Sequence, residues 1–313
     1  MQLVRRSTLA VVATATMFAV FAAAPSAHAT TGTLNLTESQ PLTEDHHGRI
    51  VVAADGITLD CAHFRVVGFD ANGARLSGAG IALTGHNNVT VRNCNIEGFT
   101  NGVLLTNSHS NAFDQIRVTS ALGAGCSLNQ SHENVFANSR FTNNTGGGCE
   151  YVGSHYNRFN FNLVVDNVDE GLDIEQSNNN QFFGNVVATN HDGFDLDDSH
   201  VNDILANQVG GNADNGIELD DSSGNWVDDN VVGSNGVNVR GNGITLDRSD
   251  GNAIRRNQST SNGRDGIRIS DLSDDNLISA NQACHNLEWD GNLDSGSGNT
   301  FSDNEFCRQR NIP

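Results

Sequence analysis

Acidic side chains that recur at a nearly constant spacing are the residues of this chain best suited to chemistry. They form two series, each with steps of 22 to 27 residues, and two further carboxylates directly follow members of the second series. Carboxyl groups that a fold brings together can donate and accept protons, or they can bind a hard cation such as Ca²⁺. The first series is Asp173, Asp195 and Glu218, the second is Glu175, Asp197, Asp220 and Asp247, and the following residues are Asp198 and Asp221.

Stacking these carboxylates is electrostatically unfavourable. At an effective dielectric constant near 20, each pair of like charges about 4.8 Å apart costs on the order of 3 kcal/mol. Either some of the groups keep their protons through raised pKa values, or a cation lies among them. The alternative is a solvated acidic face that only keeps the protein soluble. The sequence predicts a Ca²⁺ site whose ligands are Asp173, Glu175, Asp195, Asp197, Glu218 and Asp220.

Cationic and imidazole side chains occur at related positions. Arg240, Arg248, Arg264 and Arg268 follow the acidic series, and Arg268 is predicted to lie in line with the first one. Such arginines either take part in chemistry or form salt bridges with the carboxylates. Histidines form a third series, which either binds Cu²⁺ or Zn²⁺ or consists of residues that a turn tolerates. This series is His86, His109, His132, His155 and His200.

The elements that position these residues follow from a repeat of about 23 residues. Glycines followed by an apolar residue recur from Gly56 to Gly291, and an Asn series runs in phase with them from Asn88 to Asn299. After each glycine, polar and apolar residues alternate as in a strand with one buried face, and a second short apolar run follows the Asn. No segment has a period of 3.6 residues. The repeat predicts an all-β, parallel β-solenoid of about eleven coils.

The asparagines are predicted to be structural. In a solenoid, a side-chain amide at a fixed position can hydrogen-bond to the equivalent amides in the coils above and below. Asn also tolerates the left-handed backbone conformation that tight corners need. A second Asn series, five residues after the first and running from Asn162 to Asn304, is expected to form another such ladder.

The repeat resembles that of the right-handed parallel β-helix proteins of the pectate-lyase-like superfamily, and its Asn-rich form is similar to NosD-type repeats. The segments that carry this resemblance begin at Asp55-Gly56-Ile57 and at Asn88-Val89-Thr90, and the similarity extends over about residues 50–307. It implies a single-stranded right-handed β-helix. It does not define the activity, because this fold hosts lyases, hydrolases, epimerases, adhesins and accessory proteins.

The segment from Asn190 to His200 resembles two enzyme motifs. It is similar to the Gly-Phe-Asp-Pro-His-Asp-Asp motif of mannuronan C5-epimerases, but Leu196-Asp197 replaces Pro-His. Its beginning also resembles a polygalacturonase motif, whose later Asp-Asp and Gly-His-Gly parts are changed here. In pectate-lyase-like enzymes Ca²⁺ neutralises the substrate uronate and an Arg or Lys removes the C5 proton. The candidate catalytic residues are Asp195, Asp197, Asp198, Glu218, Asp220, Arg268, Arg248 and His191.

Six cysteines suggest disulfides in an exported protein. Cys126 and Cys149 are separated by 23 residues, as are Cys284 and Cys307, so each pair should stack in neighbouring coils. Cys61 and Cys94 then remain as the third pair. The alternative is six unpaired thiols that pack as small apolar side chains.

Charge and the N-terminal segment limit the location and the partners of the protein. The chain has 17 Arg, no Lys and 37 acidic residues, a formal charge of −20, which excludes binding along a nucleic-acid backbone. Residues 1–29 have the pattern of a bacterial export signal, with Arg5-Arg6, an apolar stretch and cleavage after Ala29. Residues 30–313 are predicted to form one secreted β-helix domain with no membrane span.

These observations predict a secreted, monomeric β-helix protein that acts on an extracellular polysaccharide. The predicted activity is that of a Ca²⁺-dependent lyase or C5-epimerase of a glycan that contains uronic acid. Two alternatives stay open: a non-catalytic metal- or glycan-binding solenoid of the NosD type, and a glycoside hydrolase that uses paired Asp residues.

Overall fold

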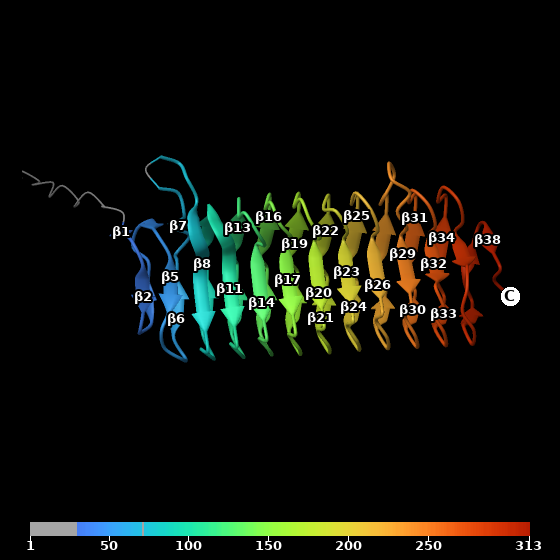
Figure 1. Ribbon diagram of the computed structural model, residues 1–313, viewed down its shortest axis with the longest axis horizontal. Helices are drawn as coiled ribbons and strands as arrows, with labels where there is room; N and C mark the ends of the chain where they lie inside the picture. Colours follow the sequence, from blue (N-terminus) through green and yellow to red (C-terminus); the bar gives the residue numbers. More distant parts are fainter. Residues whose placement is uncertain (1–29, 71) are drawn as a thin grey trace, which may run out of the picture.

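A computed structural model describes residues 30–70 and 72–313 of the chain. These residues form 38 strands in three parallel sheets, here called A, B and C, and the strands wind into a rod (Figure 1). The predicted export signal lies outside the described residues. Among the described residues, no helix is long and apolar enough to cross a membrane.

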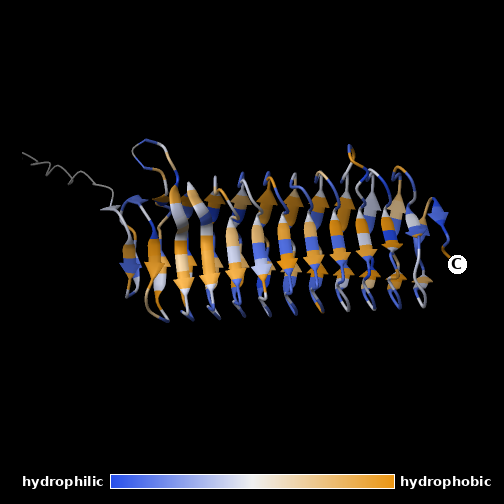
Figure 2. Cartoon of the chain, in the orientation of Figure 1, coloured by the Kyte–Doolittle hydropathy of each residue, from blue (hydrophilic) through white to orange (hydrophobic). Residues whose placement is uncertain are grey.

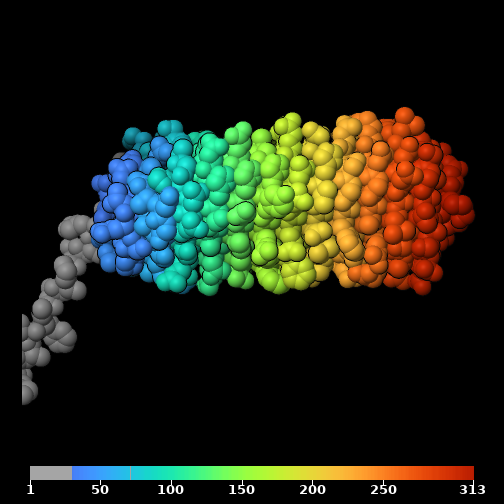
Figure 3. Space-filling view, turned by 90° about the horizontal axis from the view of Figure 1, so that it is seen from below, coloured from blue at the N-terminus to red at the C-terminus, as the bar shows by residue number. Residues whose placement is uncertain are grey.

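Each coil of the rod contributes one strand to each sheet. Within a coil the chain passes through sheet B, then sheet C, then sheet A, as in β20 (Leu172–Glu175), β21 (Gln181–Phe183) and β22 (Val186–Ala188). The sheets contain 13, 13 and 12 strands, so the rod has about twelve coils. Seen from below in Figure 3, the sequence colours form successive bands, because each coil lies between its neighbours in sequence. The all-β solenoid prediction is confirmed.

Sheet B carries both acidic series. Its strands are β2 (Leu34–Leu36), β5 (Ile50–Val52), β8 (Leu76–Thr84), β11 (Phe99–Thr106), β14 (Cys126–Asn129), β17 (Cys149–Val152), β20 (Leu172–Glu175), β23 (Phe194–Asp197), β26 (Ile217–Asp220), β29 (Ile244–Asp247), β32 (Ile267–Ser270), β35 (Gly291–Leu293) and β38 (Gln309–Arg310).

Sheet C follows the first Asn series. Its strands are β3 (Gln40–Pro41), β6 (Thr58–Asp60), β9 (Thr90–Arg92), β12 (Ala112–Asp114), β15 (Val135–Ala137), β18 (Arg158–Asn160), β21 (Gln181–Phe183), β24 (Asp203–Leu205), β27 (Trp226–Asp228), β30 (Ala253–Arg255), β33 (Leu277–Ser279) and β36 (Thr300–Ser302).

Sheet A follows the second Asn series and was not predicted as a separate element. Its strands have at most three residues, too few for an alternating pattern to stand out in the sequence. They are β1 (Thr30–Thr31), β4 (His46–His47), β7 (Arg65–Val67), β10 (Asn95–Glu97), β13 (Arg117–Thr119), β16 (Arg140–Thr142), β19 (Leu163–Val165), β22 (Val186–Ala188), β25 (Gln208–Gly210), β28 (Val231–Gly233), β31 (Gln258–Thr260), β34 (Gln282–Cys284) and β37 (Glu305–Phe306).

The core fills the inside of the coils. Figure 2 shows orange and blue segments alternating along the middle strands of sheet B, because side chains there point alternately inward and outward. Inward residues of successive coils stack on one another, as Phe113 and Phe136 do with ring centroids 4.4 Å apart. In-register stacking therefore buries the apolar residues in continuous columns that run along the rod.

Asparagine ladders hold the corners, as predicted. Asn157 accepts the backbone N–H of Asn134 at 2.8 Å, and its amide donates to the Ser131 carbonyl at 3.0 Å and to Asn180 Oδ1 at 3.1 Å. The second predicted series is a ladder too. A third, from Asn144 to Asn286, lies at the turn from sheet A to sheet B and was missed. Buried amides in all three ladders satisfy the backbone groups that the turns leave unpaired.

The conserved spacing of glycines also has a structural cause. A Cβ atom added at Gly171 would lie 2.7 Å from the carbonyl oxygen of Gly193 in the next coil. Because the following coil passes so closely at this corner, only glycine fits there.

Three disulfides join neighbouring coils, and all three predicted pairs are confirmed. Cys126 and Cys149 are register partners on β14 and β17, with Cα atoms 4.5 Å apart. The Cα separations are 4.8 Å for Cys61 and Cys94 and 5.1 Å for Cys284 and Cys307. The described residues contain no free cysteine.

Candidate functional site

Sheet register places the first acidic series in one line across sheet B. Asp173 pairs with Asp195, and Asp195 pairs with Glu218, on the neighbouring strands β20, β23 and β26. Glu150 on β17 pairs with Asp173 and extends the line by one coil. We call Glu150, Asp173, Asp195 and Glu218 the inner column. Thr245 and Arg268 continue it, so the predicted place of Arg268 is correct.

The inner column is partly buried, and its pKa values are high. Burial, followed by repulsion from neighbouring carboxylates, raises the pKa of Asp195 to about 8. The same two causes raise the pKa of Asp173 to about 7 and that of Glu218 to about 7, and burial raises the pKa of Glu150. Among the described residues, no Arg lies within ion-pair distance of these four side chains. Around neutral pH the inner column therefore holds protons that it can exchange.

A group of polar residues at the turn from sheet A to sheet B flanks the inner column. Asp192 is buried, and its carboxylate lies 2.8 Å from Nδ1 of the exposed His191. The backbone N–H of Asn215 donates to Asp192 at 2.6 Å, and its side-chain amide donates to Glu218 at 2.7 Å. Asn215 thus links the His191–Asp192 pair to the inner column.

The His191–Asp192 pair has the geometry of an oriented acid or base. Burial alone would lower the pKa of His191, but the hydrogen bond to Asp192 and the nearby charges of Glu170 and Asp214 raise it. Because Nδ1 is engaged with Asp192, the other ring nitrogen, Nε2, is the one that can exchange a proton with a ligand.

The second acidic series lies two residues further along the same strands. Glu175, Asp197, Asp220 and Asp247 are successive register partners, and we call them the outer column. Glu175 and Asp197 are exposed, whereas Asp220 and Asp247 are partly buried.

Arg248 neutralises much of the outer column. It forms ion pairs with Asp220, with Asp221 at 3.1 Å and with Asp247 at 3.6 Å. Asp221 and Arg248 occupy the same turn position in successive coils, as Asp198 does one coil earlier, and all three have a positive φ. The outer column therefore has a permanent counter-ion, unlike the inner column.

The other arginines of the predicted site are ion-paired as well. Arg268 donates to Asp294 through Nε at 3.0 Å and through Nη2 at 2.8 Å. Arg240 pairs with Glu288, which also lies 3.6 Å from Arg264. These contacts match the salt-bridge alternative that the sequence left open.

The histidine series is a hydrogen-bonded stack. His109, His132 and His155 stack with ring centroids 4.9 Å apart, and Nδ1 of each accepts a backbone N–H from the next coil at 2.9 to 3.1 Å. His200 continues the series by accepting from Ser223 at 2.9 Å. An imidazole whose Nδ1 accepts a hydrogen bond carries its proton on Nε2, so neither nitrogen is free to bind a metal.

One predicted member does not belong to this stack. Asn87, rather than His86, accepts the backbone N–H of His109, at 2.7 Å. His86 instead aligns with Ser108, to which its own N–H donates. The coils are offset by 22 residues here, so the constant spacing of 23 selected the neighbouring position.

Two groups of side chains place potential metal-binding atoms within 4.8 Å of one another. The first is Glu170, His191 and Asp192, and the second is Asp197, Asp220 and Asp221. Oxygen donors in the second group suit Ca²⁺, but Arg248 already contacts two of its three carboxylates. The six predicted Ca²⁺ ligands are thus divided between the inner and the outer column.

Sequence reasoning missed Glu150, Glu170, Asp192 and Asn215. Glu150 was within reach, because it follows Gly148 at the same distance as Asp173 follows Gly171. Glu170, Asp192 and Asn215 each precede the repeat glycine directly. That position resembles an ordinary turn in the sequence, so only its place beside the inner column indicates a function.

Comparisons with known proteins agree on the architecture. The family described as "Right handed beta helix region" matches residues 79–232, and the family described as "Periplasmic copper-binding protein (NosD)" matches residues 162–312. A comparison with curated protein sequences finds no match.

Solved structures show the same fold at low sequence identity. The periplasmic alginate epimerase AlgG is 15% identical, with a TM-score of 0.67 over 88% of this chain and 76% of that one. The A-module of the Azotobacter vinelandii mannuronan C-5 epimerase AlgE6 is 14% identical, with a TM-score of 0.62 over 88% of this chain and 87% of that one. The receptor-binding protein of bacteriophage Det7 is 11% identical, with a TM-score of 0.56 over 91% and 71%.

Proposed function

Since the chain belongs to the right-handed parallel β-helix proteins, we propose that it modifies a polysaccharide bound along sheet B. The proposed reaction is acid–base chemistry on a glycan that contains uronic acid, either elimination or C5 epimerisation. One observation carries this proposal: the inner column is a line of partly buried carboxyl groups whose pKa values lie near neutrality and which have no arginine partner.

Protonated carboxyl groups suit a uronate substrate. A proton held by Asp195 or Asp173 can be donated in a hydrogen bond to the uronate carboxylate, which neutralises that charge. Neutralising the carboxylate makes the neighbouring C5 proton more acidic and easier to remove. The inner column would thus do with protons what a bound cation does in other lyases.

His191 is the proposed group that exchanges the C5 proton. Asp192 orients its ring, so that Nε2 is left to accept a proton. In elimination, the electron pair of the C5–H bond forms the C4–C5 double bond, the C4–O4 bond breaks, and O4 leaves with a proton. In epimerisation, a proton returns to C5 from the opposite face of the sugar ring. Both reactions need an acid and a base, which the inner column and His191 supply.

Three features support an extracellular glycan as substrate. The neighbours AlgG and AlgE6 are named as alginate and mannuronan epimerases. The motif around Asp195 resembles the epimerase motif although its Pro-His is absent. Three disulfides suit an oxidising compartment outside the cytoplasm, where such polymers occur.

Ca²⁺ remains part of the proposal as an alternative to protons. Asp173, Asp195 and Glu218 would provide hard oxygen ligands at a pH where they are ionised, and Glu175, Asp197 and Asp220 would provide more from the outer column. A bound ion would supply positive charge for the uronate carboxylate. Protons and Ca²⁺ compete for the same oxygens, so the two possibilities differ in their dependence on pH.

A glycan panel tests the proposal. Alginate, pectate and glycosaminoglycans are incubated with the protein with and without Ca²⁺. Absorbance near 235 nm reports elimination, deuterium incorporation at C5 reports epimerisation, and new reducing ends without absorbance report hydrolysis. Asp195→Asn should abolish the activity. Asp203→Asn, which changes a partly buried carboxyl on sheet C, is the matched control. No product from any glycan, or equal activity of the two variants, would overturn the proposal.

A metal-binding function is the second candidate. It is favoured by the Glu170, His191 and Asp192 group, which lies within the match to the family described as periplasmic copper-binding. An imidazole and two carboxylates suit a divalent transition metal. Titration of the folded protein with Cu²⁺ or Zn²⁺ should then give one site that His191→Gln removes. Binding that His191→Gln leaves unchanged would argue against this candidate.

A further inference from the structure

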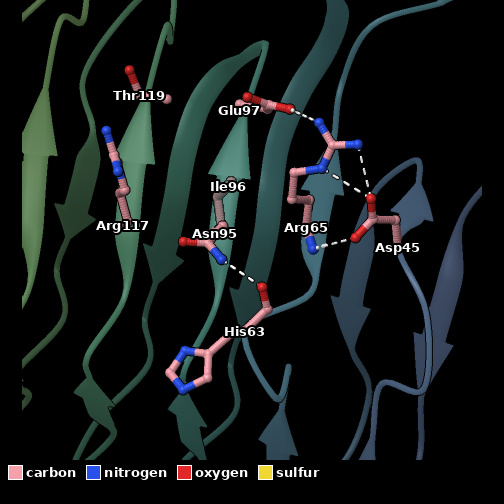
Figure 4. A pocket seen from close by; sticks show the side chains of 8 residues that line it. All are labelled: Asp45, His63, Arg65, Asn95, Ile96, Glu97, Arg117 and Thr119. Carbon is pink, nitrogen blue, oxygen red and sulfur yellow. Dashed lines mark hydrogen bonds and ion pairs between the residues drawn. The ribbon is translucent and has the colours of Figure 1, made fainter.

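A second charged surface lies on sheet A, on the coils that precede the acidic columns. Its first strand positions are register partners in the order Arg65, Asn95, Arg117 and Arg140, on β7, β10, β13 and β16. The three arginines are exposed. Figure 4 shows a hollow of about 430 Å³ between these strands, lined in part by His63, Asn95 and Thr119.

The arginines of this surface differ in their partners. Arg65 is held by Asp45 at 2.8 Å and by Glu97 at 3.2 Å. Arg117 and Arg140 have no carboxylate within 4.0 Å among the described residues, and their guanidinium groups donate no hydrogen bond there. In Figure 4 no dashed line reaches Arg117.

Two unpaired neighbouring cations are unexpected on this protein. The chain has more than twice as many acidic residues as arginines, and most arginines in its described part have a carboxylate partner. Arg117 and Arg140 lie on adjacent strands, whose backbones are about 4.8 Å apart, so their charges repel each other. An anion bound between them would remove this repulsion.

We propose that the hollow bordered by Arg65, Asn95 and Arg117, together with Arg140, binds an acidic sugar unit through its carboxylate or sulfate group. Two guanidinium groups can each give paired hydrogen bonds to such an oxyanion. The Asn95 amide and the Thr119 hydroxyl border the same hollow and suit sugar hydroxyl groups.

The rim of the hollow restricts the ligand further. Asp45 and Glu97 lie beside Arg65 and repel a ligand that carries dense negative charge. A single oxyanion surrounded by neutral hydroxyl groups avoids this repulsion, whereas a continuous phosphate backbone does not. The surface therefore favours a glycan over a nucleic acid.

This site is separate from the sheet B site in position and in charge. Three coils separate β13 from β22, or about 15 Å along the rod at one strand spacing per coil. The inference rests on the proposed function only for the class of polymer. It assigns a holding site that binds an acidic glycan directly, at a distance from the residues that would react with it.

Binding measurements with chemically matched probes test this inference. Oligogalacturonate carries only carboxylates, dextran sulfate oligosaccharide carries only sulfates, and unmodified dextran oligosaccharide is neutral. Titrations use the Asp195→Asn protein, so that no probe is turned over. At least one anionic probe should bind, with an affinity that falls as salt is added, and neutral dextran should not. The probe that binds more tightly identifies the oxyanion.

Variants then locate the binding. Replacing Arg117 and Arg140 by Gln should weaken binding of that probe at least tenfold, and Lys at both positions should give an intermediate loss, because charge remains but the planar donor pairs do not. The control replaces Arg158 and Arg255 on sheet C by Gln, which removes the same charge elsewhere, and it should change affinity less than twofold.

Three results would overturn the inference: no binding of either anionic probe, equal losses in the pocket and control variants, or tight binding of neutral dextran. Melting curves confirm that each variant is folded. Because this readout is binding, its failure leaves the activity of wild-type protein on the glycan panel as an independent test of the proposed function.

Discussion

The inner and outer columns are lines of carboxyl groups on the same strands, two residues apart, yet their surroundings differ. The inner column is partly buried, flanked by Glu170 and Asp192, and has no arginine partner among the described residues. In the outer column, Glu175 and Asp197 are exposed, and Arg248 contacts Asp220 and Asp247. Residue type alone therefore does not decide whether a carboxylate in this fold exchanges protons or forms ion pairs.

This difference has a physical cause in the turns at the two ends of each strand. The inner column lies next to the turn from sheet A, where buried acidic groups add repulsion to desolvation. The outer column lies next to the turn toward sheet C, where Arg248 occupies the position held by Asp221 one coil earlier. One substitution in that turn series provides the counter-ion.

Activity should separate the columns most strongly. Asp195→Asn removes the exchangeable proton of the inner column and should reduce turnover of the responsive glycan by roughly 100-fold or more. Asp197→Asn, two residues away in the outer column, should change turnover by less than about threefold, since that group lies outside the proton-exchanging line. Initial rates with both variants measure this. A larger loss for Asp197→Asn would reverse the assignment of the two columns.

Stability should depend on pH through the inner column. The pKa of Asp195 is about 8 in the folded protein against an ordinary value of 3.8, so the folded state binds more protons between those values. The free energy of unfolding should therefore rise as pH falls from about 8 toward 4. Melting curves at pH 9, 7 and 5 should show this rise.

The matched variant for this measurement combines Asp173→Asn, Asp195→Asn and Glu218→Gln. It should melt at a higher temperature than wild type at pH 9, because the repulsion is gone, and its melting temperature should change less with pH. Wild-type melting that is independent of pH over this range would contradict the assigned proton binding.

Ca²⁺ should distinguish protonated from ionised carboxyl groups. If the ion binds the inner column, it should raise the melting temperature at pH 9 more than at pH 6, because protons compete for the same oxygens. At a free concentration ten times the Kd the gain is about 1.4 kcal/mol. Replacing Asp195 and Asp197 by Asn should remove the response, and chelation should reverse it. Melting that is indifferent to millimolar Ca²⁺ at both pH values would exclude Ca²⁺ from the proposal.

Removing Arg248 should have the smallest effect. Arg248→Gln leaves Asp220, Asp221 and Asp247 without their counter-ion, so the melting temperature should fall slightly, and more at low salt than at high salt. Turnover should be unchanged, because the variant does not alter the inner column. A loss of turnover without a loss of stability would instead give Arg248 the catalytic role that the sequence predicted for it.

The sequence by itself determined the architecture. A repeat of about 23 residues, with Gly, Asn and alternating apolar residues in phase, is sufficient to predict a parallel solenoid and the stacking of Cys126 on Cys149. In-register stacking also turned the spacing of Asp173, Asp195 and Glu218 into a line on one sheet. A constant period is an unambiguous signal, because every coil must bury the same positions.

Only the tertiary structure decided which of these aligned residues can do chemistry. A local change of one residue in the repeat moved His86 out of the histidine stack, and the backbone N–H groups of successive coils engage Nδ1 of the imidazoles that remain. Depth relative to the turns decided that Asp195 holds a proton and that Asp192 orients His191. Burial and the nearest charge set a pKa, and both depend on side chains from neighbouring coils that the order of residues along one coil does not reveal.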